Sequence, residues 1–350
     1  PPLPARDVTG ASGEKQTMHF LLTGGSGFIG SNLARAAISR GHRVRALVRR
    51  TSVRAALEAA GAAVVEGDLF TGEGVRAALE DVDCILHLAG ATKARSAVEF
   101  HRCNAESTRT LAEAAASLPK PPRLVYCSSL AAAGPTSAGK PKSEDEEPSP
   151  VSTYGRSKLA GEMALRQFAD RLPCVIVRPP IVYGPCDREF LPALLPMARM
   201  GLMLKSGFGP KYYSLVHVDD LCEGILGAAL KGKTLDPNDP AQGVYFLSDG
   251  CEYSWEEFSA ALSRALGRSP ARVLSLPDVV SYAAGLGAQL NALLRGRVPM
   301  LSLDKARELR CEAWTCSSER AKNELCYQPS VPLDKGLEQT ISWYRKEGWI

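Results

Sequence analysis

The stretch Phe20-Leu21-Leu22-Thr23-Gly24-Gly25-Ser26-Gly27-Phe28-Ile29-Gly30 decides the fold of this chain. A short apolar run enters a turn with glycines at 24, 27 and 30, and the turn opens an amphipathic segment. This pattern predicts a strand, a tight turn and the N-terminus of a helix. Gly24 and Gly27 let the backbone approach a pyrophosphate, and Gly30 lets helix and strand pack closely. Free N–H groups and the helix dipole would hold the phosphate charge, although glycines at this spacing also mark ordinary turns.

Composition narrows the class of protein. The 350 residues are 45% hydrophobic and 23% charged, which predicts one large domain, alone or with a smaller lobe. A net charge of +4 without any basic block argues against a nucleic-acid partner, and no apolar run approaches membrane-spanning length. Residues 1–17 are rich in Pro, Gly, Ser and charge, so we expect a flexible N-terminal extension rather than a signal peptide.

The ten cysteines form no C-x-x-C pair and no Cys/His cluster at zinc spacing. Most lie within apolar runs, where a free thiol packs as a small hydrophobic group. We therefore expect reduced core cysteines, no metal site and a cytoplasmic location. Redox or metal-binding cysteines are the weaker alternative.

Strands alternate with helices along the first half of the chain. The strands are long apolar runs without period-two alternation, which is typical of a parallel sheet covered on both faces. The predicted fold is therefore α/β, a Rossmann-type doubly wound sheet. Strands are expected over 43–48, 63–65, 84–90, 124–127 and 174–177, and helices over 28–40, 53–60, 75–79, 98–118 and 154–168.

The second half is less regular, and we expect a smaller C-terminal substrate-binding lobe there. The predicted division is 18–178 for the Rossmann domain and 179–350 mainly for the lobe, with some elements returning to the sheet. Asp219 and Asp220 are expected to cap a helix over 221–230. Strands are further expected over 212–218 and 243–247, and helices over 190–200, 254–266 and 337–344, with a capping box from Ser254 to Glu257.

The segment 279–294 is apolar but interrupted by Gly285 and Gly287. It could line a pocket, form a dimer face or touch a membrane surface. We favour the pocket or a purely structural role.

Several residues near the predicted strand ends suit a dinucleotide. Arg49 and Arg50 follow the second strand where an acidic residue would favour NAD, so NADP is favoured over NAD, unless both arginines are simply solvated. Asp68 is a candidate partner for adenine. His87 is flanked by apolar residues, so it is interpreted as a core histidine rather than a catalytic one.

Tyr154 and Lys158 are four residues apart and should share one face of a helix. A neighbouring ammonium lowers the pKa of a tyrosine, which makes Tyr154 usable as a general acid or base. Ser129, at a strand end, could hold the same substrate oxygen. A Y-x-x-x-K pair alone is often a packed tyrosine beside a solvated lysine. The order of glycine turn, strand-end serine and Y-x-x-x-K favours catalysis.

From Met18 onward the chain resembles the extended short-chain dehydrogenases/reductases. The resemblance rests on segments 23–30, 67–69, 87–90, 128–129, 178–185 and 217–220, together with Tyr154 and Lys158. It implies a Rossmann domain that binds NAD(P), a catalytic set of Ser129, Tyr154 and Lys158, and a homodimer. The implied cofactor-binding residues are Gly24, Gly27, Phe28, Ile29, Gly30, Arg49, Asp68, Leu69, Ala89, Gly90, Ser128, Tyr154, Lys158, Pro179, Ile181 and Val182. The substrate candidates are Thr92, Ala131, Tyr183 and Tyr213.

Departures from the family pattern indicate the substrate class. Sugar-nucleotide enzymes of this family usually have Asn where this chain has Ile181, and often Arg where it has Tyr213. The dehydratases follow the catalytic Thr with Asp-Glu, whereas Ser129 is followed by Leu130-Ala131. The segment 128–135 is similar instead to the 3β-hydroxysteroid dehydrogenase and dihydroflavonol reductase branch, which handles hydrophobic alcohols and ketones.

The resulting hypothesis is an NAD(P)-dependent oxidoreductase acting on a hydrophobic, ring-containing small molecule, such as a steroid-like or aromatic secondary metabolite. The first alternative is a sugar-nucleotide epimerase or dehydratase with tightly bound NAD. A dinucleotide-sensing regulator is the second, and the intact catalytic set argues against it.

Overall fold

The computed structural model describes residues 17–294 and 303–350, and the side chains of 17–288 and 303–350. Except for Thr17, the extension predicted over residues 1–17 lies outside the described residues.

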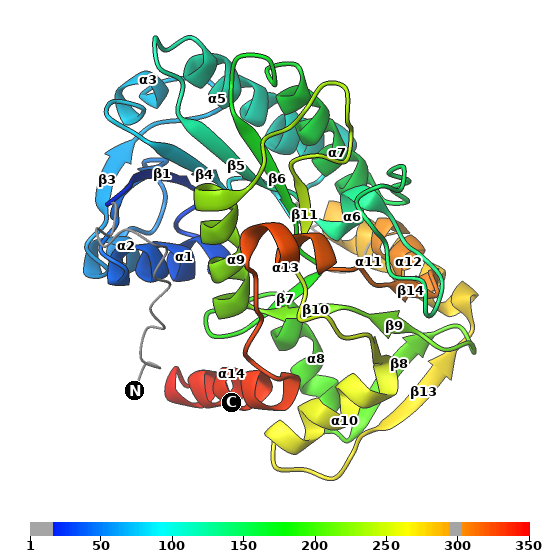
Figure 1. Cartoon of the computed structure of the whole chain (residues 1–350). Helices are drawn as coiled ribbons and strands as arrows, with labels where there is room; N and C mark the ends of the chain where they lie inside the picture. Colours follow the sequence, from blue (N-terminus) through cyan, green and yellow to red (C-terminus); the bar gives the residue numbers. More distant parts are fainter. Residues whose placement is uncertain (1–16, 295–302) are drawn as a thin grey trace.

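A seven-stranded parallel sheet forms the centre of the described chain (Figure 1). Its order is β11-β6-β5-β4-β1-β2-β3. Every residue of β1, β4 and β6 is buried, as continuous apolar strands in a covered parallel sheet should be. The strands are β1 (His19–Thr23), β2 (Arg43–Val48), β3 (Ala63–Glu66), β4 (Cys84–His87), β5 (Arg123–Cys127), β6 (Cys174–Arg178) and β11 (Val244–Phe246).

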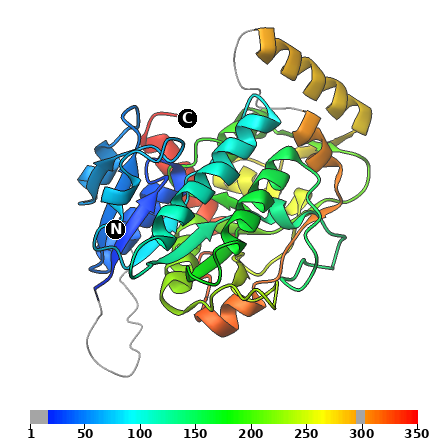
Figure 2. The same ribbon diagram turned by 90° about the horizontal axis from the view of Figure 1, so that it is seen from above.

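Helices cover both faces of the sheet (Figures 1 and 2). One hydrophobic core joins the sheet to α1 (Phe28–Ser39), α2 (Ala55–Ala59), α9 (Val218–Lys231) and α13 (Glu319–Leu325). A second core, on the opposite face, joins it to α3 (Val75–Ala78), α5 (Ser107–Ala116) and α7 (Thr153–Arg166). This two-layered covering confirms the doubly wound Rossmann fold.

The helix predicted over 98–118 is continuous in space but changes its winding. It comprises α4 (Ala97–His101), a π-helical turn over Arg102–Glu106, and α5. A π-helical turn inside an α-helix often lies at a functional site, and this one contains Asn104, which is fully buried.

The remaining elements build a smaller lobe around its own core. Side chains of α8 (Phe190–Arg199), α10 (Trp255–Ala265) and α14 (Leu333–Lys346) meet there. The capping box of Ser254 and Glu257 begins α10 as predicted. Three small sheets complete the lobe, formed by β7 (Ile181–Tyr183) with β10 (Leu215–His217), β8 (Leu202–Ser206) with β13 (Arg272–Leu276), and β9 (Tyr212–Tyr213) with β12 (Tyr253–Ser254) and β14 (Ala313–Trp314).

The segment predicted as one strand over 212–218 differs from the expectation. It divides at Ser214 into β9 and β10, which belong to different sheets. His217 caps α9, because its ring Nδ1 accepts the Asp219 N–H. Asp220 lies inside the helix and accepts N–H groups of Ser330 and Val331 instead. The prediction that the two aspartates cap this helix was therefore wrong.

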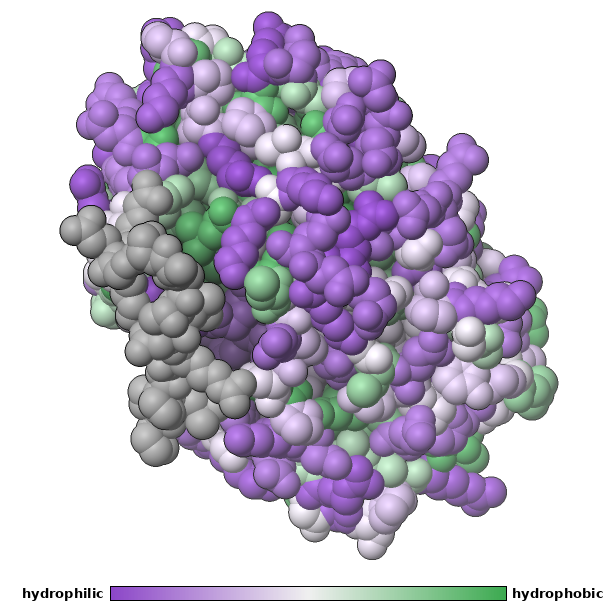
Figure 3. Space-filling model, viewed as in Figure 1, coloured by the Kyte–Doolittle hydropathy of each residue, from purple (hydrophilic) through white to green (hydrophobic). Residues whose placement is uncertain are grey.

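The apolar segment 279–294 forms α11 (Asp278–Leu294), which Gly285 and Gly287 do not interrupt. In Figure 2, α11 stands out from the body of the molecule. Val279 is 70% exposed and Leu286 48%, so these side chains do not line an enclosed pocket. The face drawn in Figure 3 is mainly hydrophilic, with hydrophobic residues in small groups. Within the described residues, no helix is both long and apolar enough to cross a membrane.

Candidate active site

The glycine turn between β1 and α1 has no room for a side chain at Gly24 or Gly30. Gly24 has φ +72°, and a Cβ there would lie 2.6 Å from the Ala89 nitrogen. A Cβ on Gly30 would collide with the Gly24 carbonyl oxygen. The turn is closed by the Gly27 N–H, which donates to Gly24 O at 3.1 Å.

This turn fits the diphosphate of a dinucleotide. Gly27 caps α1 without any side-chain hydrogen bond, and the first turn of α1 carries no acidic residue. The helix therefore presents free N–H groups and its positive dipole end beside Ser26 and Gly27, which are both exposed. Phe28 and Ile29, both half-buried, continue the helix from this point.

A buried histidine supports the next strand end. His87 is fully buried, its two ring nitrogens bond the hydroxyls of Thr23 and Thr108, and burial lowers its pKa to about 3. The Thr23 hydroxyl also accepts the Ala89 N–H at 3.2 Å. The geometry is that of a neutral core histidine, which fixes the backbone leading to Ala89 and Gly90.

The residues predicted for the adenosine side lie around β2 and β3. Arg49 is exposed, its carbonyl accepts the Ser52 N–H at 2.9 Å, and within the described residues its guanidinium makes neither a hydrogen bond nor an ion pair. Arg50 instead approaches Glu66 at 3.5 Å. One carboxylate oxygen of Asp68 accepts the Phe70 N–H at 2.7 Å. Leu69 is buried beside it.

Asn104 is a site residue whose role the sequence analysis missed. Its amide bonds both the N–H and the carbonyl of Ala91 and donates to Ser157 at 2.8 Å. It thus ties the loop after β4 to the helix of Tyr154 and Lys158. A polar residue among the apolar positions of the predicted helix 98–118 was the available signal.

Ser129 and Tyr154 lie close to one another. The Ser129 hydroxyl accepts the Ala131 N–H and so caps α6 (Leu130–Ala133). Burial raises the pKa of Tyr154, the nearby Ser129 hydroxyl opposes this, and Cys127 adds to it. Tyr154 is therefore a protonated phenol near neutral pH.

Lys158 lies one turn further along α7, but its ammonium is turned to the strand. Nζ donates to the Cys127 carbonyl at 2.7 Å and lies 4.3 Å from the ring centre of Tyr126. Burial lowers the pKa of Lys158 to about 8. Burial is the largest influence on the pKa of Tyr154 and raises it, so the net shift is opposite to the lowering expected from Lys158.

A buried ion pair contacts Ser128, the neighbour of the predicted catalytic residue Ser129. Glu162 is fully buried and accepts two bonds from Arg178, at 2.9 and 2.6 Å. The same carboxylate accepts the Ser128 hydroxyl at 2.5 Å. The loops after β5 and β6 are further joined where Leu130 N–H donates to the carbonyl of Pro179. Ile181 and Val182 follow on β7, half-buried.

The substrate candidates do not all share one environment. Tyr213 is half-buried, with its ring 5.7 Å from that of Trp255, and Ala131 is half-buried on α6. Thr92 is exposed and donates to Glu189 at the start of α8. Tyr183 is fully buried within the lobe core against His217, so it is not accessible to a ligand.

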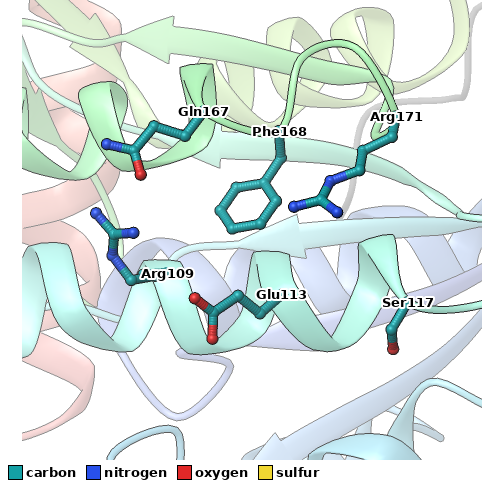
Figure 4. Close-up of a pocket in the computed structure, with 6 residues that line it drawn as sticks. All are labelled: Arg109, Glu113, Ser117, Gln167, Phe168 and Arg171. Atoms are coloured by element: carbon teal, nitrogen blue, oxygen red, sulfur yellow. The ribbon is translucent and has the colours of Figure 1, made fainter.

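A recess of about 480 Å³ lies elsewhere, between α5 and the end of α7 (Figure 4). Phe168 lies between α5 and Arg171, and the Arg171 guanidinium is 5.0 Å from its ring. None of the predicted site residues lines this recess. Its lining residues are Arg109, Glu113, Ser117, Gln167, Phe168 and Arg171.

Comparison with known proteins identifies the family. Residues 20–240 match the model of the NAD dependent epimerase/dehydratase family. The chain belongs to this family. A ceramide reductase of Caulobacter vibrioides is 33% identical, with 94% of this chain and 95% of the relative covered. The 4-hydroxy-2-methyl-3-oxo-4-farnesyl-3,4-dihydroquinoline-1-oxide ketoreductase of Stigmatella aurantiaca is also 33% identical, over 92% and 95%.

Among solved structures, MoeE5 in complex with UDP-glucuronic acid and NAD matches with a TM-score of 0.71 and 25% identity, covering 94% of this chain and 99% of that one. The chain is thus an extended short-chain dehydrogenase/reductase. Because its named relatives are reductases and dehydrogenases, it is an NAD(P)-dependent oxidoreductase.

Proposed function

We propose that this oxidoreductase interconverts a ketone and an alcohol on a hydrophobic, ring-containing small molecule, with Tyr154 as general acid and base. The observation that carries the proposal is the Tyr154 phenol, which lies beside Ser129 and whose pKa is raised by burial. A protonated phenol can give its proton to the oxygen of a carbonyl as that oxygen gains charge. Ser129 orients the same oxygen.

The nicotinamide of the bound cofactor supplies or accepts the hydride. The glycine turn and the first N–H groups of α1 bind the diphosphate, and Ala89 and Gly90 leave room beside the strand end. Lys158 holds the nicotinamide ribose, and Pro179 to Val182 lie near the nicotinamide. Arg49, whose guanidinium has no partner within the described residues, favours NADP through its 2′-phosphate.

The substrate side supports an apolar ligand. Tyr213 and Trp255 form an aromatic pair, and Phe100 lies 6.0 Å from the Tyr154 ring. Ile181 and Tyr213 stand where sugar-nucleotide enzymes of this family bind phosphates. Two relatives are named for a ceramide and for a farnesylated quinoline oxide, both hydrophobic.

Tyr154→Phe tests the proposal, with NADPH and NADH oxidation measured against aromatic ketones, sterols and long-chain ketones. Loss of the proton donor should lower kcat about a hundredfold to ten-thousandfold. The affinity for the dinucleotide should stay within about twofold, because the phosphate contacts are elsewhere.

Tyr212→Phe is the matched control, since Tyr212 is half-buried on β9 and is not part of the catalytic set. It should keep wild-type turnover. Turnover retained by Tyr154→Phe would contradict the assignment of the acid.

The second candidate is a sugar-nucleotide epimerase, favoured by the likeness to MoeE5 with its bound UDP-glucuronic acid and NAD. Such an enzyme recycles its own NAD. Purified protein that retains NAD, binds a UDP-sugar and needs no added dinucleotide would support it and exclude the ketone reductase.

Two further parts of the proposal concern the whole molecule. We place the enzyme in the cytoplasm as a homodimer. Val98 on α4 and Met163 on α7, the helix against which α4 packs, are 76% and 54% exposed, which supports a subunit contact through these helices. Sedimentation at several protein concentrations measures the subunit number.

A further inference from the structure

A carboxylate from the C-terminal lobe lies at the N-terminus of the catalytic helix. It belongs to Asp304 on α12 (Leu303–Arg310). One oxygen of Asp304 accepts the Thr153 N–H at 2.6 Å and the Tyr154 N–H at 3.3 Å, and the other accepts the Thr153 hydroxyl at 3.1 Å. These contacts span 150 residues of sequence.

The same helix end has a second, local cap. Ser152 accepts the Gly155 N–H through its hydroxyl at 3.0 Å. The first-turn N–H groups of α7 are thus shared between a neighbouring serine and a distant aspartate. A negative charge at this position also interacts favourably with the helix dipole. Of these two caps, only Asp304 accepts the Tyr154 N–H, while the Tyr154 carbonyl accepts the Ser157 hydroxyl at 2.7 Å.

The rest of α12 faces the same centre. Glu308 lies one turn after Asp304, and its charge acts on both Tyr154 and Tyr213. Its backbone carbonyl accepts the Trp314 indole N–H at 2.9 Å, which joins α12 to β14. Arg310, at the end of α12, contacts Tyr282 and Asp278 of α11. The charge of Glu308 therefore acts on both tyrosines, and α12 itself packs against α11.

We propose that Asp304 is a positioning residue for the reaction, which fixes the backbone of Tyr154 and joins the substrate-side wall formed by α12 to the catalytic helix. This inference rests on the proposed role of Tyr154. Without Asp304, the Thr153 and Tyr154 N–H groups lose their bonds and the first turn of α7 loosens. The phenol then spends less time aligned with the substrate oxygen, and small misplacements of a catalytic group reduce the rate strongly.

Asp304→Ala, Asp304→Asn and Ser152→Ala test the inference in the full-length enzyme. Both alanine variants remove a cap of the same helix, at a similar cost in stability. Asp304→Ala should lower kcat about tenfold or more, because it alone releases Tyr154. Asp304→Asn, which keeps one acceptor oxygen, should recover part of this loss. The Km for the dinucleotide should stay within about twofold in all three, since its phosphate site is untouched.

Amide hydrogen exchange gives a second reading that needs no substrate. In Asp304→Ala, the amides of Thr153 and Tyr154 should exchange about five- to tenfold faster, as expected for a lost cap. In Ser152→Ala the Gly155 amide should respond instead. Equal losses of kcat in the two alanine variants, or unchanged exchange in Asp304→Ala, would overturn the inference.

The two readings separate this inference from the proposed function. A wild-type enzyme that turns over no ketone or alcohol overturns the proposed function, and Asp304 is then judged by exchange alone. Turnover with unchanged Thr153 and Tyr154 exchange in Asp304→Ala overturns only the role of Asp304.

Discussion

The glycine turn and α12 hold the two sides of one centre by different means. The turn is backbone against backbone, with Gly24 and Gly30 too close to neighbouring carbonyl and amide groups for any Cβ. On the other side, α12 is joined to its neighbours mainly through side chains, with Asp304 bonded to α7, Arg310 to α11 and the Glu308 carbonyl to the Trp314 indole. In the proposed site, the cofactor side is therefore shaped by close backbone contacts, whereas the substrate side depends more on side-chain contacts.

The two regions should therefore respond differently to amino-acid substitution. A substitution in the turn should move the main chain and destroy the proposed phosphate site. A substitution in α12 should remove one contact and leave the fold unchanged. A fixed cofactor site beside an adjustable substrate wall lets one fold serve many substrates, because function resides in sites carried by the fold.

The sharpest test of the cofactor side compares Gly24→Ala with Gly41→Ala. Both glycines have positive φ, +72° and +86°, so each alanine bears backbone strain of about 1–2 kcal/mol. At Gly41 a Cβ meets nothing within 4 Å, but at Gly24 it meets the Leu88 and Ala89 backbone. Fluorescence titration should show dinucleotide affinity about a hundredfold weaker or worse for Gly24→Ala, because displacing the turn loses several phosphate contacts.

Gly41→Ala should bind the dinucleotide as the wild type does, with only a lower Tm. Similar affinities for the two variants would mean that the close approach at Gly24 does not shape the phosphate site.

The next test concerns the boundary between the two sides, the buried Glu162–Arg178 pair. Glu162→Gln leaves the Arg178 charge without its counterion, which should cost about 3–5 kcal/mol of unfolding free energy. The double variant Glu162→Met/Arg178→Met should be less destabilised than either single variant, since neither charge of the pair is left buried without its partner. Urea unfolding measures both. A double variant as unstable as the sum of the singles would show that the pair does not act as a unit.

Much of the cofactor side could be predicted from the sequence, because its determinants are local. Gly24, Gly27 and Gly30 are consecutive parts of one strand–turn–helix unit. The continuous apolar runs of β1, β4 and β6 indicate a doubly covered sheet. Ser129 and Tyr154 follow the same logic, since both lie at the beginnings of helices after parallel strands.

The other side could not be predicted, because its contacts join distant segments. Nothing in the sequence near Asp304 indicates that it caps a helix 150 residues earlier. The misassigned Asp220 is similar, since its partners Ser330 and Val331 come from far along the chain. The pKa of Tyr154 also depends on packing, and burial reverses the direction that the i, i+4 lysine alone predicts.

The pH dependence of the unfolding free energy tests whether water is excluded from the Lys158 ammonium. Its pKa is lowered to about 8, whereas in the unfolded chain it is near 10.5. Between these two pH values the unfolded state binds more protons at Lys158 than the folded state does. The Lys158 contribution to the unfolding free energy therefore rises with pH in this range. It is least favourable to the folded state below pH 8. The slope is at most about 1.4 kcal/mol per pH unit.

Lys158→Met should remove this rise when urea unfolding is compared at pH 7.5 and 9.5 (about the width of the window). Buried thiols on which Lys158 does not act, such as Cys84 and Cys174, affect both proteins alike and cancel in the difference. Cys127 does not cancel, because the Lys158 charge lowers its otherwise raised pKa. If the unfolding free energies of the two proteins changed with pH in parallel, the Lys158 ammonium would be accessible to water.

The smallest expected effect is at the exposed edge of the cofactor side, where Arg49 would meet a 2′-phosphate. Arg49→Ala should weaken NADPH about five- to tenfold and NADH less than about twofold, because an exposed ionic contact contributes on the order of 1 kcal/mol. Arg50→Ala is the matched control, since Arg50 lies next in sequence but approaches Glu66. The NADPH effect should shrink in high salt, which screens exposed charges. Equal losses of affinity for NADPH and NADH would contradict the role of Arg49 in selecting NADP.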